Sequence, residues 1–226
     1  MLRAIAFDFD GVLVESVEVK TRAFARLFAS ETPEVVERIV RYHRQQGGIS
    51  RFEKFAAIYR DILKRPLSEE MFQWLCEQFS QLVVEEIVAA PWAEGAREFV
   101  TRYHGRYRFF VVSGTPHEEL TDIMTRRGMA QWFDEVVGSP KTKEVLLREV
   151  MSRCHLQPAE IVFIGDAESD WLAARQVGIS FIWRRTSDQR AELPGFSGPA
   201  IPSLVDLEAC LSTFGARRAG QRARPR

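Results

Sequence analysis

The stretch LRAIAFDFDG, residues 2–11, is an apolar run that contains two aspartates and ends at a glycine. A short apolar run bounded by Asp-Gly predicts a buried β-strand followed by a turn. The turn accounts for Asp10 and Gly11, but it does not account for Asp8, whose charge lies inside the apolar run. Asp8 is therefore the first candidate functional residue.

Apolar runs of the same kind recur along the chain, at residues 108–113, 135–138, 161–165 and 180–183. Between them lie segments with helical patterns, at residues 95–103, 117–127, 144–154 and 170–177. Strands that alternate with helices indicate βαβ units and a parallel sheet with helices on both faces. We therefore expect an α/β fold with a doubly wound, Rossmann-like core.

One part of the chain breaks this alternation, because the patterns within residues 15–90 are helical throughout (16–29, 33–46, 50–63 and 68–88). Thr32-Pro33 predicts a helix start and Gly47-Gly48 a helix end, and the alternation resumes at Pro91. The sequence thus predicts an all-helical unit inserted after the first strand. The expected domains are an α/β core, residues 1–14 and 91–215, and a helical insertion, residues 15–90.

Composition and charge argue against several classes of protein. The 31 basic and 31 acidic side chains give zero net charge, which offers no electrostatic basis for binding nucleic acid or an anionic membrane. The three cysteines lie far apart, and no stretch has the length of a membrane span or the pattern of a secretion signal, so we expect a cytoplasmic protein. Residues 216–226 carry five arginines and no acidic residue, which predicts a disordered basic tail.

Polar residues follow four of the expected strands, at the edge where parallel sheets bind ligands. They are Asp8 and Asp10 after the first strand, Ser113 and Gly114 after the second, Lys141 or Lys143 after the third, and Asp166 after the fourth, with Asp170 four residues later. Carboxylates brought together at one edge repel each other unless a cation lies among them. Because oxygen ligands suit Mg²⁺, the sequence predicts a magnesium site there.

The segment after the second core strand indicates an anion site. The Ser113 hydroxyl and the Gly114 amide can donate to a phosphate oxygen. Thr115, Pro116 and Glu118 match a capping box with proline at the first helical position, so we expect Thr115 to cap the next helix. A helix N-terminus directed at the site favours a bound anion.

These motifs occur in the order found in the haloacid dehalogenase-like (HAD) superfamily, which the chain resembles over residues 1–185. They are DFDGVL at 8–13, VVSG at 111–114, a following lysine, and GDxxxD at 165–170. The helical insertion resembles the C1-type cap of the branch that includes phosphoglycolate phosphatases and β-phosphoglucomutases. The resemblance implies an enzyme that transfers a phosphoryl group to an aspartate.

The resemblance also implies a role for each acidic residue of the site. Asp8 would be the covalent nucleophile, and Asp10 the general acid for the leaving oxygen and later the base that activates water. Asp166 would ligate Mg²⁺ together with the Asp8 side chain and the Asp10 backbone carbonyl. Asp170 would either support the site lysine or bind a metal-bound water.

Two lysines compete for the position that neutralises phosphate charge and holds Asp8. Lys143 lies directly before an apolar helix, which favours it, whereas the separation from Asp166 favours Lys141. Many family members have a Lys-Pro pair here, and this chain has none. We expect Lys143 at the site and Lys141 on the surface.

The helical insertion supplies the residues expected to set specificity. Residues 47–51, GGISR, resemble the substrate loop of capped relatives, in which an arginine meets a distal anionic group. Arg51 is therefore either a substrate contact or a solvated arginine at a helix start. Lys20 lies near the hinge, where mutase-like members carry a histidine; this difference disfavours a mutase and leaves Lys20 as a possible anion contact.

The sequence and the resemblance together predict a Mg²⁺-dependent phosphatase that acts on a small phosphorylated metabolite (phosphoglycolate, a sugar phosphate or a nucleotide) through an aspartyl phosphate. A phosphomutase is the alternative. A dehalogenase fits less well, because that branch does not need Asp10 and the metal site, and a non-catalytic binding protein would not need Asp8 and Asp10. Neither nucleic acid nor a membrane is an expected partner, and we expect a monomer or a homodimer.

Overall fold

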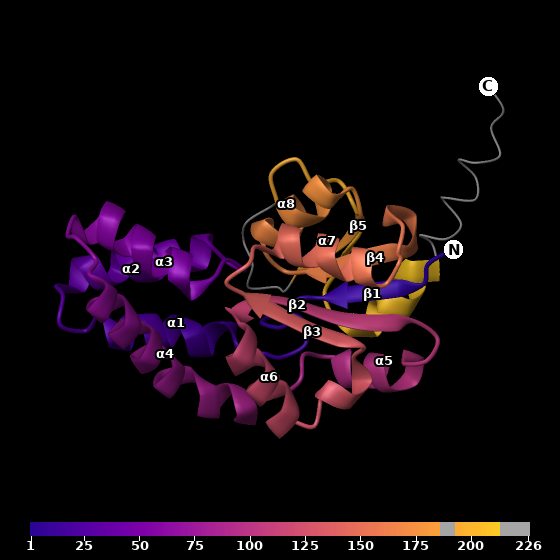
Figure 1. Ribbon diagram of the computed structural model, residues 1–226, viewed down its shortest axis with the longest axis horizontal. Helices are drawn as coiled ribbons and strands as arrows, with labels where there is room; N and C mark the ends of the chain where they lie inside the picture. Colours follow the sequence, from indigo (N-terminus) through magenta and orange to yellow (C-terminus); the bar gives the residue numbers. More distant parts are fainter. Residues whose placement is uncertain (186–192, 213–226) are drawn as a thin grey trace.

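The computed structural model describes residues 1–185 and 193–212, and at its centre lies a six-stranded parallel sheet (Figure 1). The strands are β1 (Ala4–Phe7), β2 (Arg108–Pro116), β3 (Glu135–Ser139), β4 (Ile161–Gly165), β5 (Ser180–Arg184) and β6 (Ala200–Ile201). Their order, β3-β2-β1-β4-β5-β6, confirms the doubly wound α/β prediction, because the chain winds outward on both sides of β1. The five predicted strands are present, and β6 is a two-residue strand too short to show a periodicity in the sequence.

Helices cover both faces of this sheet (Figure 1). Helices α5 (Ala96–Tyr103) and α6 (His117–Arg126) pack on one face, and α7 (Lys143–Arg153) and α8 (Glu168–Val177) pack on the other. The side chains of β1 divide between the two faces, with Ile5 and Phe7 toward α5 and α6 and Ala4 and Ala6 toward α7 and α8. Because successive strand residues point to opposite faces, burial on both sides explains why β1 is apolar throughout.

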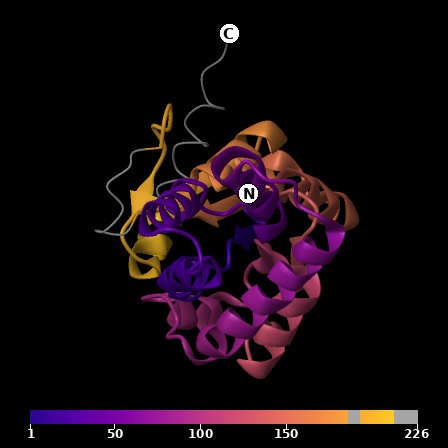
Figure 2. The same ribbon diagram turned by 90° about the vertical axis from the view of Figure 1, so that its left-hand side faces the viewer.

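A helical unit lies beyond the carboxyl ends of the strands (Figures 1 and 2). It contains α1 (Val17–Leu27), α2 (Pro33–Gln45), α3 (Arg51–Ala57), a π-helix (Ile58–Leu63) and α4 (Glu69–Ala89), and we call it the cap. The π-helix continues α3 where the sequence predicted one longer α-helix. Phe24, Phe55 and Phe79 pack against one another inside the cap, with ring centroids 4.8–6.0 Å apart. Short 3₁₀ turns lie in the core, at Ala130–Trp132, Pro158–Glu160 and Leu204–Asp206.

The long helix α4 turns its apolar stripe inward. Leu75, Phe79, Val83 and Ile87 are buried at a spacing of four residues, which keeps them on one face of the helix. Trp74 lies off this stripe and is 47% exposed. The buried apolar residues of α4 thus serve the interior of the protein.

Two neighbouring segments connect the cap with the core. Val14 forms an antiparallel bridge with Trp92, and the amide of Ala93 donates to the carbonyl of Leu13 over 2.9 Å. The chain therefore leaves the core and returns to it at adjacent points. The domain limits themselves stay a prediction, and the predicted tail, residues 216–226, lies outside the described residues. Within those residues, no helix combines the length and apolar character that a membrane span requires.

Candidate active site

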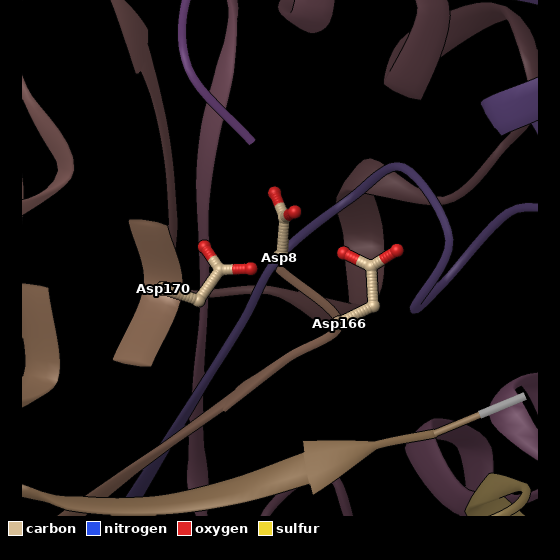
Figure 3. A group of neighbouring side chains, drawn as sticks. All are labelled: Asp8, Asp166 and Asp170. Atoms are coloured by element: carbon tan, nitrogen blue, oxygen red, sulfur yellow. The ribbon is translucent and has the colours of Figure 1, made fainter. Parts of the chain in front are cut away.

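Three carboxylates meet where the order of the strands reverses, the point at which doubly wound sheets bind their ligands. Asp8 follows β1, Asp166 follows β4, and Asp170 lies in the first turn of α8. Each offers a carboxylate oxygen within 4.8 Å of the other two, and Figure 3 shows the three side chains converging. The structure thus brings together the acidic side chains that the sequence analysis selected.

A buried lysine joins two of these carboxylates. The Lys143 ammonium lies 2.9 Å from Asp8 Oδ2 and 2.5 Å from Asp170 Oδ1, and Lys143 is only 6% exposed. Lys141, the alternative, lies on the surface, where it pairs with Glu149 over 2.7 Å and its side chain is 55% exposed. The structure therefore places Lys143 at the site, because α7 begins at this residue at the edge formed by the strand ends.

Asp170 is held by both of its carboxylate oxygens. Oδ1 accepts from Lys143, and Oδ2 accepts from the Ala167 amide over 3.1 Å, at the start of α8. The backbone at Gly165 packs directly against Asp170, since an added Cβ would lie 2.4 Å from the Asp170 Cβ. Asp170 therefore supports the site lysine and also satisfies a free amide at a helix start.

The acidic cluster carries negative charge that a cation would relieve. Burial raises the pKa of Asp8 to about 7, although Lys143 partly opposes this rise. Burial, and then the Asp8 carboxylate, raise the pKa of Asp166 well above its ordinary value. Shifts of this direction show that the carboxylates repel each other and have lost hydration. A largely buried cluster of carboxylate oxygens of this kind fits Mg²⁺, which takes a few carboxylates and keeps some of its waters.

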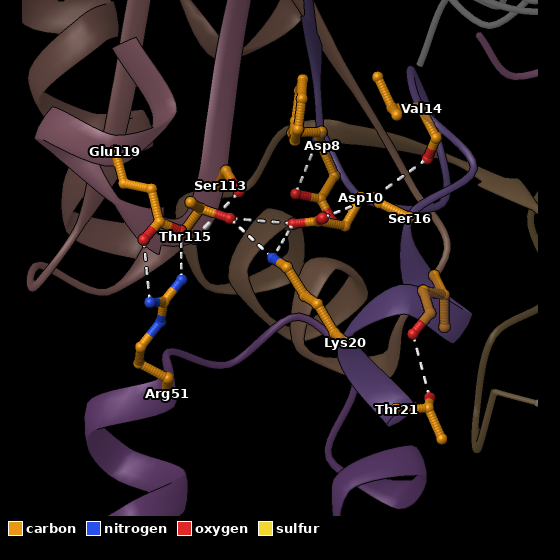
Figure 4. A network of polar contacts seen from close by, with 12 residues as sticks. Asp8, Asp10, Val14, Ser16, Lys20, Thr21, Arg51, Ser113, Thr115 and Glu119 are labelled. Carbon is orange, nitrogen blue, oxygen red and sulfur yellow. Dashed lines mark hydrogen bonds and ion pairs between the residues drawn. The ribbon is translucent and has the colours of Figure 1, made fainter. Parts of the chain in front are cut away.

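Asp10 lies beside this cluster and points toward the cap, as Figure 4 shows. Its carboxylate accepts hydrogen bonds from Lys20 (2.5 Å), Ser16 (2.6 Å) and Thr115 (3.0 Å). Burial acts to raise the pKa of Asp10, but the Lys20 ammonium and the hydrogen bonds outweigh burial, and the pKa is lowered. Lys20 of the cap thus contacts the predicted general acid, a contact that the sequence analysis did not foresee.

The segment after β2 differs from its predicted form. β2 continues through Pro116, and Pro116 itself precedes α6 without a side-chain cap, so the predicted capping role of Thr115 is wrong. Instead, the Thr115 hydroxyl donates to Asp10 and accepts from Lys20 over 2.8 Å. The fold brings these two charged groups close to the hydroxyl, which bonds to them in place of a backbone amide of α6. Ser113 is fully buried, and its hydroxyl accepts from the Thr115 amide over 3.1 Å.

The glycine loop of the cap lies directly on the core. The Ser169 hydroxyl donates to the Gly47 carbonyl over 2.9 Å. A Cβ added to Gly114 would lie 2.5 Å from the Gly48 carbonyl oxygen, and one added to Gly48 would lie 3.1 Å from the Lys143 ammonium. The loop therefore covers the site lysine and the predicted phosphate-binding amide, and the cap is closed over the strand ends.

Arg51 begins α3 but does not face solvent, so the alternative of a solvated arginine is wrong. The residue is 5% exposed, and its guanidinium forms a bidentate ion pair with the Glu119 carboxylate of α6 (Figure 4). The Ser80 hydroxyl accepts from Arg51 over 2.8 Å and donates to Glu119 over 2.5 Å. The guanidinium carbon also lies 4.6 Å above the centre of the Phe79 ring. In this conformation Arg51 is bound within the protein.

A second buried lysine lies deeper in the cap. Lys54 is 4% exposed, and its ammonium lies 3.0 Å from His43 Nδ1. Burial, and then the Lys20 ammonium, lower the pKa of Lys54 to about 7. His43 stacks on Phe24 with ring centroids 4.4 Å apart, and burial and Lys54 lower its pKa to about 2. Both groups are therefore close to losing, or have lost, their positive charge at neutral pH.

Three further residues lie near the site although the sequence did not predict them there: Ser16, Lys54 and Glu119. The available signal was the i, i+4 spacing of Ser16 and Lys20, which places both on one side of α1. Glu119 offered no signal, because an acidic residue in the first turn of a helix is explained by the helix dipole alone.

Comparisons with known proteins agree with this arrangement. A family model for haloacid dehalogenase-like hydrolases matches residues 2–178. A phosphoglycolate phosphatase from Vibrio vulnificus is 24% identical over 229 residues, which cover 91% of this chain and 96% of the relative. A phosphorylated carbohydrates phosphatase from Thermotoga maritima is 24% identical over 189 residues, which cover 80% and 84%. The solved structure of a β-phosphoglucomutase from Clostridium difficile has the same fold, with a TM-score of 0.77, 16% identity, and coverage of 97% of this chain and 100% of that chain.

Proposed function

The chain belongs to the haloacid dehalogenase-like hydrolase family, and on that premise we propose that it is a Mg²⁺-dependent phosphatase of small phosphorylated metabolites. The observation that carries the proposal is the group of buried Asp8 and Lys143 and half-buried Asp166 at the reversal of the strand order, with Asp10 beside it. Relatives named as phosphatases, similar over most of the chain, support this reaction class. The family itself is the one that the sequence motifs predict.

In the first step, an Asp8 oxygen attacks the phosphorus, and the bond between phosphorus and the leaving oxygen breaks. Lys143 stabilises the charge on Asp8 and on the phosphate. Burial acts to lower the pKa of Lys143, but Asp170 and Asp8 outweigh burial and raise the pKa, so the lysine stays charged. Ser113 and the Gly114 amide would bind the phosphate oxygens.

Asp10 moves the protons in both steps. As an acid it gives a proton to the leaving oxygen, and as a base it takes a proton from the water that attacks phosphorus and breaks the bond to Asp8. The products are the dephosphorylated alcohol, inorganic phosphate and the free enzyme. The lowered pKa of Asp10 beside Lys20 favours the carboxylate, which is the form that the second step requires, and disfavours the protonated form that the first step requires.

The metal would be held by the carboxylates of Asp8 and Asp166 and by the Asp10 backbone carbonyl, with Asp170 at the edge of this group. A bound Mg²⁺ supplies the positive charge that lets an acidic site accept a phosphate dianion. Asp170 contributes mainly through Lys143, because both of its oxygens already accept hydrogen bonds.

The experiment that tests this function measures inorganic phosphate released from a panel of phosphorylated metabolites and from p-nitrophenyl phosphate, with Mg²⁺ or with EDTA. We expect release by the wild type with Mg²⁺ and none with EDTA. Asp8→Asn should lower kcat by a factor on the order of 10³ or more while the fold is kept, because an amide cannot form the acyl phosphate. Lys143→Met should also lose activity, and Lys141→Met is the matched control that should keep it.

Retained activity in Asp8→Asn would contradict the assignment of the nucleophile. The fold shared with the β-phosphoglucomutase does not decide between hydrolysis and transfer within the substrate. Formation of a phosphorylated isomer in the presence of a bisphosphate primer, without free phosphate, would identify the phosphomutase instead.

A further inference from the structure

A buried ion pair links the cap to the core close to the proposed site. Arg51 begins α3 of the cap, and Glu119 lies in the first turn of α6. The guanidinium contacts both oxygens of the carboxylate, and the Ser80 hydroxyl bonds to both groups. The two side chains are 4% and 9% exposed, so the pair has little contact with water.

The pair lies near the residues proposed to act on the leaving group, as Figure 4 shows. Glu119 follows Thr115 by four residues, and Thr115 contacts Asp10, the residue proposed to protonate the leaving oxygen. Arg51 follows Gly48 by three residues, and the Gly48 carbonyl lies against Gly114. Figure 4 shows Arg51 and Glu119 on the Thr115 side of Asp10, and we take the part of the substrate beyond the leaving oxygen to extend in this direction.

We propose that Glu119 neutralises Arg51 and thereby selects phosphate monoesters whose non-reacting part carries no second negative charge, an inference that rests on the proposed phosphatase function. The substrate class is a phosphate ester of a neutral, hydroxyl-bearing compound. Phosphoglycolate, with its carboxylate, falls outside this class, although several relatives are named for it.

A substrate with a negative charge on its non-reacting part is disfavoured near the Arg51–Glu119 pair in either of two ways. An anion that pairs with Arg51 must displace Glu119, and a buried carboxylate left without its partner is strongly destabilised. If Glu119 stays, its charge repels the anion at short range in a region of low dielectric constant. A neutral hydroxyl group incurs neither cost, so the pair acts as a selective element against anionic compounds.

The test compares two substrates of similar size, phosphoglycolate and 2-hydroxyethyl phosphate, which differ in the charge of the non-reacting end. We expect the wild type to have a kcat/KM about tenfold or more higher for 2-hydroxyethyl phosphate. Glu119→Gln keeps a hydrogen-bonding side chain and removes the charge, so it should shift the ratio toward phosphoglycolate by about tenfold or more. The double variant Arg51→Gln/Glu119→Gln should lose this gain, because no cation remains to receive the carboxylate.

A matched control separates charge selection from cap closure. Arg126 of α6 and Glu85 of α4 also join core and cap, over 2.7 Å, but their side chains are 36% and 76% exposed. Glu85→Gln should leave the substrate ratio unchanged. An equal shift in Glu85→Gln and Glu119→Gln would show that any weakened cap contact alters the ratio, and it would overturn the proposal.

Binding provides a readout that does not depend on turnover. Isothermal titration with Mg²⁺ present compares 3-phosphonopropionate with 3-hydroxypropylphosphonate, which mimic the two substrates and cannot be hydrolysed. The wild type should bind the hydroxyl compound more tightly, and Glu119→Gln should reverse or remove the difference. A failure of the phosphatase function would appear as the absence of phosphate release from every compound, with this binding preference still present. An unchanged preference in Glu119→Gln, a wild type that prefers the carboxylate compound, or no binding of either compound would overturn the proposal.

Discussion

Lys54 shows how burial of one charged residue couples the site to stability. In the folded protein its pKa is lowered from 10.5 to about 7, with burial as the main cause and Lys20 as the next. Between these two pH values the unfolded chain binds a proton that the folded protein has lost. The free energy of unfolding therefore rises with pH between about 7 and 10.5 through this group. Below pH 7 Lys54 is charged in both states, and burial of its charge destabilises the folded protein fully.

Replacement of Lys54 by methionine should remove this cost. We expect Lys54→Met to have a higher Tm than the wild type at pH 7 and the difference to shrink as the pH approaches 10. Thermal unfolding of both proteins at one-unit intervals across this range measures the effect. The exposed Lys141 provides the control, because Lys141→Met removes an ammonium that stays in water and should change Tm little at any pH. A constant difference at all pH values would show that packing, not charge burial, decides the effect.

At the scale of elements, the glycine loop between α2 and α3 controls how closely the cap approaches the core. Gly48 has a φ of +75°, which side-chain-bearing residues rarely adopt. A Cβ at this position would lie 2.2 Å from the Ser169 hydroxyl oxygen and 3.1 Å from the Lys143 ammonium. The loop can therefore lie on the core only because this residue has no side chain.

Gly48→Ala should lower kcat/KM for p-nitrophenyl phosphate by about tenfold or more, because the loop and Lys143 must shift apart. The free energy of unfolding should fall by about 1 kcal/mol from the backbone conformation alone. Gly105→Ala is the matched control, since Gly105 has a φ of +85° and open space around an added Cβ. Its stability should fall by a similar amount while activity is kept. Equal activity losses in the two variants would contradict a role for loop contact.

At the scale of the whole molecule, the cap and the core meet across a strongly charged interface. Among the described residues, the cap contributes the Lys20 ammonium and the core contributes the Lys143 ammonium. Four carboxylates lie around these two groups: Asp8, Asp10, Asp166 and Asp170. Burial, and then repulsion from neighbouring carboxylates, raise the pKa values of Asp8 and Asp166, so their charged forms are disfavoured at this interface. Folding is therefore expected to gain stability when a divalent cation binds.

Magnesium should raise the Tm of the wild type, by the equivalent of about 1.4 kcal/mol at a free concentration tenfold above Kd. Asp166→Asn should respond much less. With EDTA at pH 8 the same variant should melt above the wild type, because it removes one of the mutually repelling carboxylates. Differential scanning fluorimetry with and without Mg²⁺ checks both signs, and Asp206→Asn, on an exposed turn, is the control. An equal magnesium response in wild type and Asp166→Asn would contradict the proposed metal site.

The order of the core elements and the family could be predicted from local patterns in the sequence. The local patterns are apolar runs, helical periodicity and polar residues at strand ends, such as Asp8 and Asp166. Because the carboxyl ends of parallel strands lie at one edge of the sheet, the residues that follow them come close together. The cytoplasmic location and the monomeric or homodimeric state stay predictions from the same patterns. The β6 strand and the π-helix were not predictable, because they are too short or too similar to an α-helix in their periodicity.

Which polar groups meet became clear from the three-dimensional fold alone. Lys143 and Lys141 differ little in sequence, and the burial of one beside Asp8 separates them. Thr115 matches a helix cap locally, yet it contacts Lys20, 95 residues away. Arg51 pairs with Glu119 across 68 residues. Such contacts depend on how the cap lies on the core. They join residues far apart in the sequence, so they leave no periodic pattern from which they could be predicted.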